Sequence, residues 1–371
     1  MKKIGILIAE LTDSKIEFNA VIMNSFLLYD LIEKIEGYEP LMIIVSENNI
    51  STNNKKINYY NKNYNYINYN SKDIENNKFD ILLQTSYEID YNDVIVLKTL
   101  IPNIKIGLIL LGNSYFITLS DYLYMGTKVY NIDDKFTKYD FIWTSPHYEH
   151  CITYLKTKYK TENVYISPYI WDSKFIERKI KESNYKFNID NVDNIGIFEG
   201  NIMPTKTSII PIYICERLEN KSNIIKKVTL TNLCKFIDKQ SFNEDISILD
   251  LYKKNKLLLY DSPVKIIKTL KENNINTIVS HQVYNELNYL HLEALYMKLP
   301  LIHNSKMLMN YGYYYPDFDI EIGSIQLEKI ILEHKNNIVE YNKLCEECIS
   351  KYSINNQNNI DEYKKLLNII N

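Results

Sequence analysis

The sequence has little glycine and few cysteines for its length. Its 371 residues include 9 glycines and 5 cysteines. Neither G-x-G-x-x-G nor G-x-x-x-x-G-K-[ST] occurs, which argues against a dinucleotide-binding dehydrogenase and against a P-loop enzyme. The odd number of cysteines, in apolar or helical surroundings, favours a reducing compartment. We therefore expect no structural disulfide.

An excess of one charge and long hydrophobic runs are also missing. Lys plus Arg total 43 and Asp plus Glu total 46, so the net charge of -3 gives no reason to expect nucleic acid as a partner. The apolar runs 4–9 and 106–111 are much shorter than the roughly 20 residues that span a bilayer, and the first is too short for a signal peptide. The sequence predicts a cytoplasmic globular protein without a transmembrane segment.

Strand-like and helix-like segments alternate along most of the chain. The first segment, 3–9, is a continuous apolar run of strand length, which suits a parallel strand that is covered on both faces. Further strand-like segments lie at 41–45, 79–84, 104–111, 194–198, 226–230, 256–260, 277–280 and 301–303. Helical spacing of apolar residues occurs at 20–35, 205–218 and 287–297. This order is typical of α/β domains, and the length favours two of them, with Pro168 in a plausible hinge.

Tyrosine is abundant, with 33 residues. The densest stretch, 53–77, mixes tyrosine with asparagine and lysine and has almost no aliphatic residues. We expect it to be a solvated loop or an edge insertion.

The first candidate site is the segment 198–207, which passes from a strand end through Gly200 to an expected helix start. Pro204 suits the first helical turn, and Thr205 or Thr207 could cap it. Free backbone N–H groups and the Lys206 ammonium would then face a phosphate. The alternative is an ordinary strand-to-helix turn with a solvated lysine.

The second candidate site is the segment 288–305, an amphipathic helix followed by a turn and a strand. Glu293 lies among apolar residues of this helix, where an unpaired carboxylate is costly. It therefore needs a partner. The two hydroxyls of a sugar diol could serve, and so could a cation in a helix-to-loop salt bridge.

Two other clusters rank lower. Cys345 and Cys348 have the spacing of a zinc ligand pair, but no second pair exists, so we expect a helix face and no metal. His147 and His150 could share a helix face. His147 is either a residue of the site or a local capping or packing residue.

The segment Glu293-Ala294-Leu295, followed by the turn and strand 298–302, resembles the donor-site signature of GT-B glycosyltransferases in the family 4-like group. Motifs along most of the chain resemble an uncharacterised glycosyltransferase-like family of bacteria and giant viruses. These motifs lie at 112–115, 142–148, 168–171, 201–207, 303–305 and 312–318.

The resemblance implies an α/β protein of GT-B architecture, with two Rossmann-like domains whose parallel sheets face a central cleft. Residues 1–165 would form the acceptor-side domain and residues 170–345 the nucleotide-sugar donor domain. Residues 346–371 would form a C-terminal helix that returns toward the N-terminal domain. No Asp-x-Asp motif of a metal-dependent GT-A enzyme stands out.

The implied reaction moves a sugar from a nucleotide-diphosphate sugar, a UDP-sugar by family base rates, to a glycan, lipid or protein acceptor. No metal and no cofactor are expected apart from the donor substrate. Lys206 would contact the diphosphate and Glu293 the ribose, and His147 is the third catalytic candidate. The other residues expected to bind the donor are Gly200, Asn201, Thr205, Thr207, His281, Asn288, Asn304 and Ser305. The tyrosine-rich turn 310–317 would either shape the sugar pocket or pack as a surface turn.

Two positions depart from the family pattern. The pattern has a second glutamate one loop before Glu293, where this sequence offers Tyr284 or Asn285, and Glu286 only if the loop shifts. Ala20 stands where a glycine is expected after the first strand.

The resemblance suggests retaining chemistry, which needs no enzyme nucleophile. Inverting chemistry would need a base, for which Glu10, Asp13, Glu17 and His147 are the candidates. The rival to a transferase is a non-catalytic nucleotide- or sugar-binding protein on the same fold. A GT-B-like epimerase or phosphorylase ranks third.

Overall fold

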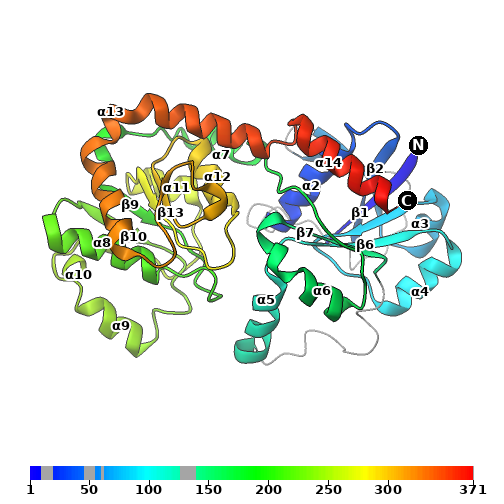
Figure 1. Cartoon of the computed structure of the whole chain (residues 1–371), viewed down its shortest axis with the longest axis horizontal. Coiled ribbons are helices and arrows are strands. Elements are labelled where there is room, and N and C mark those ends of the chain that lie inside the picture. Colours follow the sequence, from blue (N-terminus) through cyan, green and yellow to red (C-terminus); the bar gives the residue numbers. More distant parts are fainter. Residues whose placement is uncertain (10–19, 46–54, 60–61, 126–138, 371) are drawn as a thin grey trace. The chain divides into compact units, whose positions relative to one another are not determined.

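The computed structural model describes residues 1–9, 20–45, 55–59, 62–125 and 139–370. The chain divides into two compact units, one formed by residues 1–172 with 352–371 and the other by residues 173–351. Each unit is built on its own sheet (Figure 1). Within the described ranges, no helix is both long enough and apolar enough to cross a membrane.

The first unit has an eight-stranded sheet in the order β3-β4-β2-β1-β5-β6-β7-β8. Neighbouring strands pair in parallel except β3 and β4. The strands are β1 (Lys2–Ala9), β2 (Tyr38–Val45), β3 (Lys55–Tyr59), β4 (Lys62–Asn68), β5 (Ile81–Gln84), β6 (Lys105–Leu110), β7 (Phe141–Thr144) and β8 (Val164–Ile166). The helices are α2 (Ala20–Ile32), α3 (Ser71–Asn77), α4 (Tyr91–Leu100), α5 (Ser114–Ser120), η1 (Asp121–Met125), η3 (Pro146–Cys151), α6 (Ile152–Tyr159) and α14 (Gln357–Ile369).

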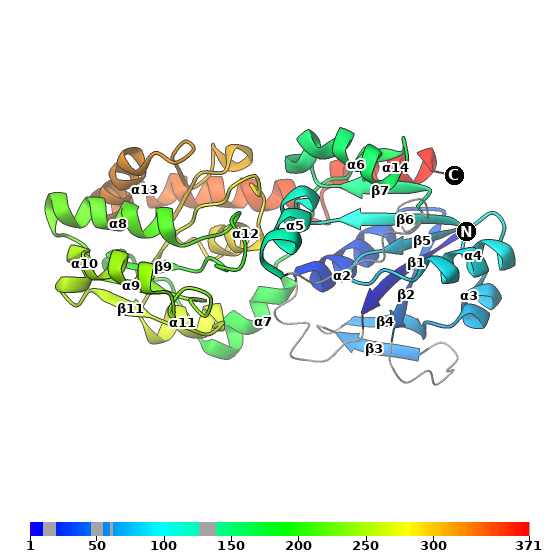
Figure 2. The same ribbon diagram turned by 90° about the horizontal axis from the view of Figure 1, so that it is seen from below.

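The tyrosine-rich stretch 53–77 is an edge insertion, as one of the two expectations had it. It supplies β3 and β4, the outermost strands in Figure 2, and α3. It is not simply solvated, because Tyr64 is fully buried and packs edge-on against Phe26 and Tyr29 of α2. The Tyr64 hydroxyl donates to the buried Asp30. Together with the buried Ile67 and Ile74, aromatic rings supply the apolar area of this stretch.

The second unit has a six-stranded, entirely parallel sheet in the order β11-β10-β9-β12-β13-β14. The strands are β9 (Asn194–Ile197), β10 (Lys227–Leu230), β11 (Leu257–Leu259), β12 (Thr277–Val279), β13 (Leu301–His303) and β14 (Tyr313–Tyr314). The helices are α7 (Lys174–Ser183), η4 (Ile189–Asn191), α8 (Ile209–Ser222), α9 (Gln240–Ser247), α10 (Asp250–Lys253), α11 (Ile266–Glu272), α12 (Tyr289–Tyr296), η5 (Lys306–Leu308) and α13 (Ile320–Tyr352). The predicted α/β class with two Rossmann-like sheets is therefore confirmed.

The helix expected from residue 205 begins later, at Ile209. Asn201 has a left-handed backbone (φ 53°), and its side-chain oxygen accepts the Ser208 N–H at 2.8 Å. The Lys206 N–H donates to the Met203 carbonyl, which closes a turn. These bonds hold 201–207 as a loop, so Pro204 does not start the helix and neither Thr205 nor Thr207 caps it.

The C-terminal segment consists of two helices with a break at Ser353. Residue 346, where a separate helix was expected to begin, lies inside α13. The second helix, α14, lies beside α2 in the first unit (Figure 1). There the Tyr363 hydroxyl donates to the Pro168 carbonyl and the Tyr38 hydroxyl donates to Asn368.

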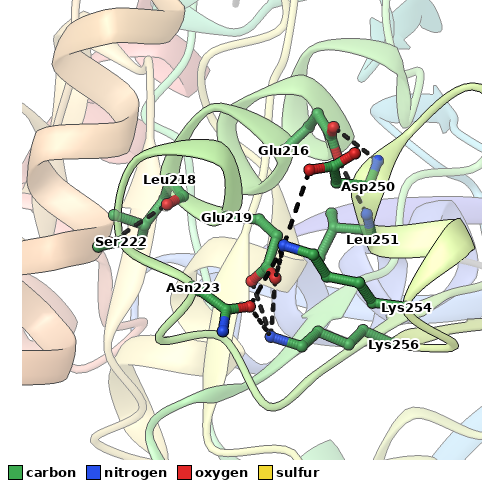
Figure 3. A network of polar contacts seen from close by, with 9 residues as sticks. All are labelled: Glu216, Leu218, Glu219, Ser222, Asn223, Asp250, Leu251, Lys254 and Lys256. Carbon is green, nitrogen blue, oxygen red and sulfur yellow. Dashed lines mark hydrogen bonds and ion pairs between the residues drawn. The ribbon is translucent and has the colours of Figure 1, made fainter.

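A buried polar network ties α8 to α10 and β11 (Figure 3). The fully buried carboxylate of Glu219 accepts from Lys254 at 2.9 Å and from Lys256 at 2.8 and 2.9 Å. One turn earlier, Glu216 accepts the backbone N–H groups of Asp250 and Leu251. Lys256 immediately precedes β11, so this network lies at the amino end of that strand and stabilises the fold there.

Glu219→Gln should lower the free energy of unfolding by about 1 to 3 kcal/mol, because one carboxylate serves two ammonium groups that the amide cannot neutralise. Urea denaturation would measure the change. The control is Glu328→Gln, which removes the partner of the half-exposed Lys221 and should cost at most about 1 kcal/mol. Equal losses in the two variants would contradict the role given to Glu219.

Candidate functional site

Three loops meet at the carboxyl ends of β9, β12 and β13. These strands are adjacent and parallel, so the loops that follow them leave the same edge of the sheet. The Val283 N–H donates to the Thr205 carbonyl at 2.9 Å. Asn304 bonds to both backbone groups of Gln282, accepting from its N–H and donating to its carbonyl, each at 2.9 Å. The structure thus brings both predicted candidate segments to one edge, which we call the carboxyl edge.

At the centre of this edge lies Glu199, which sequence reasoning did not single out. Its side chain is buried and accepts three hydrogen bonds, from the Ser280 hydroxyl at 2.5 Å, the His281 N–H at 3.1 Å and the Gln282 amide at 2.6 Å. Burial raises the pKa of Glu199 to about 7, against these donors and the nearby Lys206 charge. The available signal was a carboxylate placed two residues after the end of a buried strand.

Lys206 is half-buried, and no described residue forms a hydrogen bond or an ion pair with its ammonium group. Burial lowers the pKa of Lys206, and the neighbouring Glu199 opposes that shift. A half-buried ammonium without a partner is suited to binding an anion. The role of Lys206 in diphosphate binding therefore stays a prediction. The helix start that motivated this prediction lies further along the chain, at Ile209.

Glu293 lies on α12 and is also half-buried. Its carboxylate makes no hydrogen bond and no ion pair within the described part of the chain, so the salt bridge considered from the sequence is not formed there. Burial raises the pKa of Glu293 to about 7, and the charge of Lys179 on α7 only partly offsets this. Glu293 is therefore partly shielded from solvent, as the sequence indicated, and no described residue serves as the hydrogen-bond or ion-pair partner that its carboxylate needs.

Three expected donor-binding asparagines hold the loops themselves. Asn201 donates to the Thr231 carbonyl and the Ser208 hydroxyl. Asn288 is the N-cap of α12 and accepts from the Leu290 N–H at 2.9 Å, while Asn304 is bonded to Gln282. Their amides shape the edge.

The remaining expected donor-binding residues differ in how open they are. Thr205 is buried and its carbonyl is bonded to Val283, whereas Thr207 is half-buried. A Cβ on Gly200 would meet only Ile202, at 3.8 Å, so no neighbour requires glycine at that position.

His281 and Ser305 each present a buried polar atom at this edge. The Tyr315 hydroxyl donates to the Ser280 carbonyl, so we assign the proton of its 2.9 Å contact with His281 to Nδ1 of the imidazole. His281 Nε2 is then an acceptor, and it has no partner among the described residues. Burial lowers the pKa of His281 to about 4, which keeps the ring neutral. The Ser305 hydroxyl also lacks a partner within that set.

The tyrosine-rich turn packs inward at its centre. Tyr315 is fully buried and its hydroxyl contacts His281, and Tyr313 is also buried. Phe318 is exposed, with its ring centroid 4.8 Å from that of His281. The aromatic side chain that reaches the surface beside His281 is therefore Phe318.

The stretch where the family pattern has its other glutamate presents no unbonded carboxylate. Tyr284 is exposed and has a left-handed backbone (φ 48°), whereas Asn285 is buried and donates to Gln282 at 2.7 Å. The carboxylate of Glu286 accepts from the Met307 N–H at 3.2 Å.

His147 belongs to the other unit, where it is buried in η3 with its ring 3.9 Å from that of Tyr148. His150 is exposed whereas His147 is buried, so the two histidines do not share a buried face. Glu10, Asp13 and Glu17 lie outside the described residues. Cys345 and Cys348 are buried free thiols on α13, and no group of side chains in the described ranges is arranged to hold a metal ion.

The family described as "Protein of unknown function (DUF2827)" matches residues 4–367. No curated protein matches the sequence. Among solved structures, a trehalose-6-phosphate synthase studied with bisubstrate glycomimetics aligns over 98% of this chain and 99% of its own, with a TM-score of 0.59 and 10% identity. A related Escherichia coli structure bound with UDP-2-fluoro glucose aligns over 98% and 99%, with a TM-score of 0.58 and 11% identity. A glycosyltransferase from Rickettsia africae aligns over 99% and 98%, with a TM-score of 0.55 and 13% identity. The chain therefore has the fold of GT-B glycosyltransferases.

The unpartnered Glu293 should make the protein less stable at high pH. Its folded pKa of about 7 lies above the unfolded value, so its contribution to stability is present below about pH 4 and is lost as the pH rises through about 7. Glu293→Gln should therefore gain about 1 to 3 kcal/mol over the wild type above pH 7 and nothing near pH 4.

Urea denaturation across this pH range measures the difference between the two proteins. Glu340→Gln, at an exposed carboxylate of α13, is the control and should follow the wild type. A loss of stability in Glu293→Gln at high pH would mean that the carboxylate has a structural partner.

Proposed function

We propose that this chain, which belongs to the DUF2827 family, is a glycosyltransferase that moves a sugar from a nucleoside-diphosphate sugar to an acceptor. The observation that carries the proposal is the presence of an ammonium group, Lys206, and a carboxylate, Glu293, that both lack partners among the described residues of the unit built on β9–β14. Both are half-buried, which is costly unless a ligand completes them. The GT-B fold supports a glycosyl donor as that ligand.

The two residues suit different parts of one donor. Lys206 offers a cation to the diphosphate, and the departing diphosphate gains charge that such a group stabilises without a metal. Glu293 offers two acceptor oxygens to the two hydroxyls of a ribose. His281 Nε2 and the Ser305 hydroxyl add polar atoms without partners among the described residues in the loops after β12 and β13.

A uridine-based donor and retaining chemistry are the finer parts of the proposal. The E. coli structure of the same fold holds UDP-2-fluoro glucose, and the synthase structure concerns glycosyl transfer with retention. Both belong to those proteins and serve here as support. The family 4-like donor signature around Glu293 motivates the same choice. The acceptor would be a glycan, a lipid or a protein.

One observation favours a second candidate, a nucleotide- or sugar-binding protein without turnover. The register of the second glutamate in the family pattern is occupied by Tyr284 or Asn285, and the Asn285 amide is bonded to Gln282. If a carboxylate there were needed for turnover, the chain would bind donors and release no product.

A ligand screen followed by a turnover assay tests both candidates. UDP at about 100 times its dissociation constant should add roughly 2.7 kcal/mol of stability, and this should persist in the presence of EDTA. Release of UDP from a UDP-sugar, alone or with an acceptor, would support the transferase. Binding without any release would favour the second candidate, and no stabilisation by any nucleoside diphosphate would overturn both.

Lys206→Ala and Glu293→Gln should weaken binding in different ways. Lys206→Ala removes a charged hydrogen bond to phosphate, worth about 1.5 to 3 kcal/mol, so affinity for UDP and for pyrophosphate should fall roughly 10- to 150-fold. Glu293→Gln turns one acceptor oxygen into a donor, so it should weaken UDP and leave pyrophosphate binding almost unchanged. Calorimetry with the two ligands measures both effects.

The matched control for the charge is Lys268→Ala, at an exposed lysine of α11, which should bind both ligands like the wild type. Equal losses for UDP and pyrophosphate in Glu293→Gln would contradict a ribose contact. Unchanged pyrophosphate binding in Lys206→Ala would contradict a diphosphate contact.

A further inference from the structure

One chain of hydrogen bonds runs from Glu199 into α12. Ser280 Oγ lies 2.5 Å from Glu199 Oε1 and 2.8 Å from His291 Nε2. An ionised carboxylate only accepts, so the single Ser280 proton goes to Glu199, and His291 must donate its Nε2–H to Ser280. His291 is two residues before Glu293 on α12, so this chain of hydrogen bonds anchors the helix that carries Glu293, the residue proposed to bind the ribose.

A second chain runs from the other oxygen of Glu199 into the loop before α12. Gln282 Nε2 donates to Glu199 Oε2 at 2.6 Å, and Gln282 Oε1 accepts from Asn285 Nδ2 at 2.7 Å. Neither amide can flip without placing two donors or two acceptors face to face. The carboxylate at the head of the chain thus fixes the orientation of both amides.

These chains are sealed from solvent. Ser280, Gln282, Asn285 and His291 are each less than a tenth exposed, and Glu199 is 1% exposed. Water is therefore a poor substitute for a broken bond in either chain. The same carboxylate also accepts the His281 N–H and provides a negative charge that acts on Lys206.

We propose that Glu199 is a positioning residue of the donor site, whose acceptor-only carboxylate orients the loop 280–288 and the start of α12. It touches no ligand itself and acts through Ser280 and Gln282. The inference rests on the proposed function for its ligand-binding consequence, but the order it imposes on the loop is a property of the free protein.

Two variants of nearly unchanged side-chain volume test the direction of the hydrogen bonds in the second chain of bonds, because they exchange donors and acceptors and leave the packing the same. In Glu199→Gln the new amide nitrogen faces the Gln282 amide nitrogen, and turning Gln282 only moves the conflict to Asn285. Adding Gln282→Glu restores every pairing. The carboxylate introduced at position 282 accepts from the amide introduced at position 199 and from Asn285, while the remaining amide oxygen at position 199 still accepts from Ser280.

The first measurement is hydrogen exchange on the ligand-free proteins, about one pH unit above the Glu199 pKa of about 7, where the carboxylate is ionised. In Glu199→Gln, protection of amides in 280–291 should fall roughly tenfold, and in the double variant most of it should return. The second measurement is calorimetry with UDP, in which the dissociation constant should rise roughly tenfold and recover in the same way.

Glu216→Gln is the matched control. It also neutralises a buried carboxylate that accepts backbone N–H groups, but in the network at the amino end of β11. It should reduce protection around 250–256 and lower the melting temperature, with protection of 280–291 and the UDP dissociation constant unchanged. If Glu199 had only a structural role, Glu199→Gln would also lower the melting temperature and leave the UDP dissociation constant unchanged.

The outcomes separate the two proposals. Wild-type protection of 280–291 in Glu199→Gln, or no recovery in the double variant, would overturn the positioning role whether or not UDP binds. Wild-type UDP affinity in a Glu199→Gln protein with a loosened loop would also overturn it. A wild-type protein that binds no nucleotide, with the expected exchange pattern, would overturn the proposed function alone.

Discussion

A buried carboxylate must be surrounded by donors, and that requirement organises the carboxyl edge of the second sheet. Glu199 lies two residues after the end of β9, and its oxygens accept from a hydroxyl, a backbone N–H and an amide of the loop after β12. Two strands that are neighbours in space but distant in sequence are thereby joined at their ends. The loop cannot take another conformation without leaving part of the carboxylate unsatisfied, which is costly in a buried setting.

The second unit uses buried carboxylates at both ends of its sheet, for different purposes. Glu219 faces two lysines and Glu216 caps the start of α10, so their negative charges are met within the fold. In the loop 201–207 and in α12, the Lys206 ammonium and the Glu293 carboxylate form no hydrogen bond and no ion pair with the described residues. Charged groups that the fold leaves without a hydrogen bond are the ones that a ligand can bind, and this difference is the physical basis for proposing the donor site at the carboxyl edge.

The scarcity of glycine is visible in the backbone. Among the residues that the structure describes, six asparagines, at 184, 201, 223, 232, 255 and 274, have left-handed conformations where glycine would often be found. Asparagine tolerates this region because its side chain bonds locally. Asn201 is an example: its backbone is left-handed, and its side-chain amide donates to the Ser208 hydroxyl and the Thr231 carbonyl. A loop after a strand can therefore approach a ligand without a glycine-rich sequence.

The sequence by itself determined the α/β class, because apolar segments of strand length that alternate with segments of helical spacing have few other solutions. It also indicated Glu293, since a carboxylate among apolar residues of a helix is unusual in any fold. It could not place the start of α8, because the bond from Ser208 to Asn201 is a detail of a closed loop. Nor could it find the cluster around Glu199, whose partners His281 and Gln282 lie about 80 residues away along the chain. Only the pairing of β9 with β12 brought them together. The stability of a buried carboxylate depends on which donors surround it, and the order of residues along the chain does not contain that information.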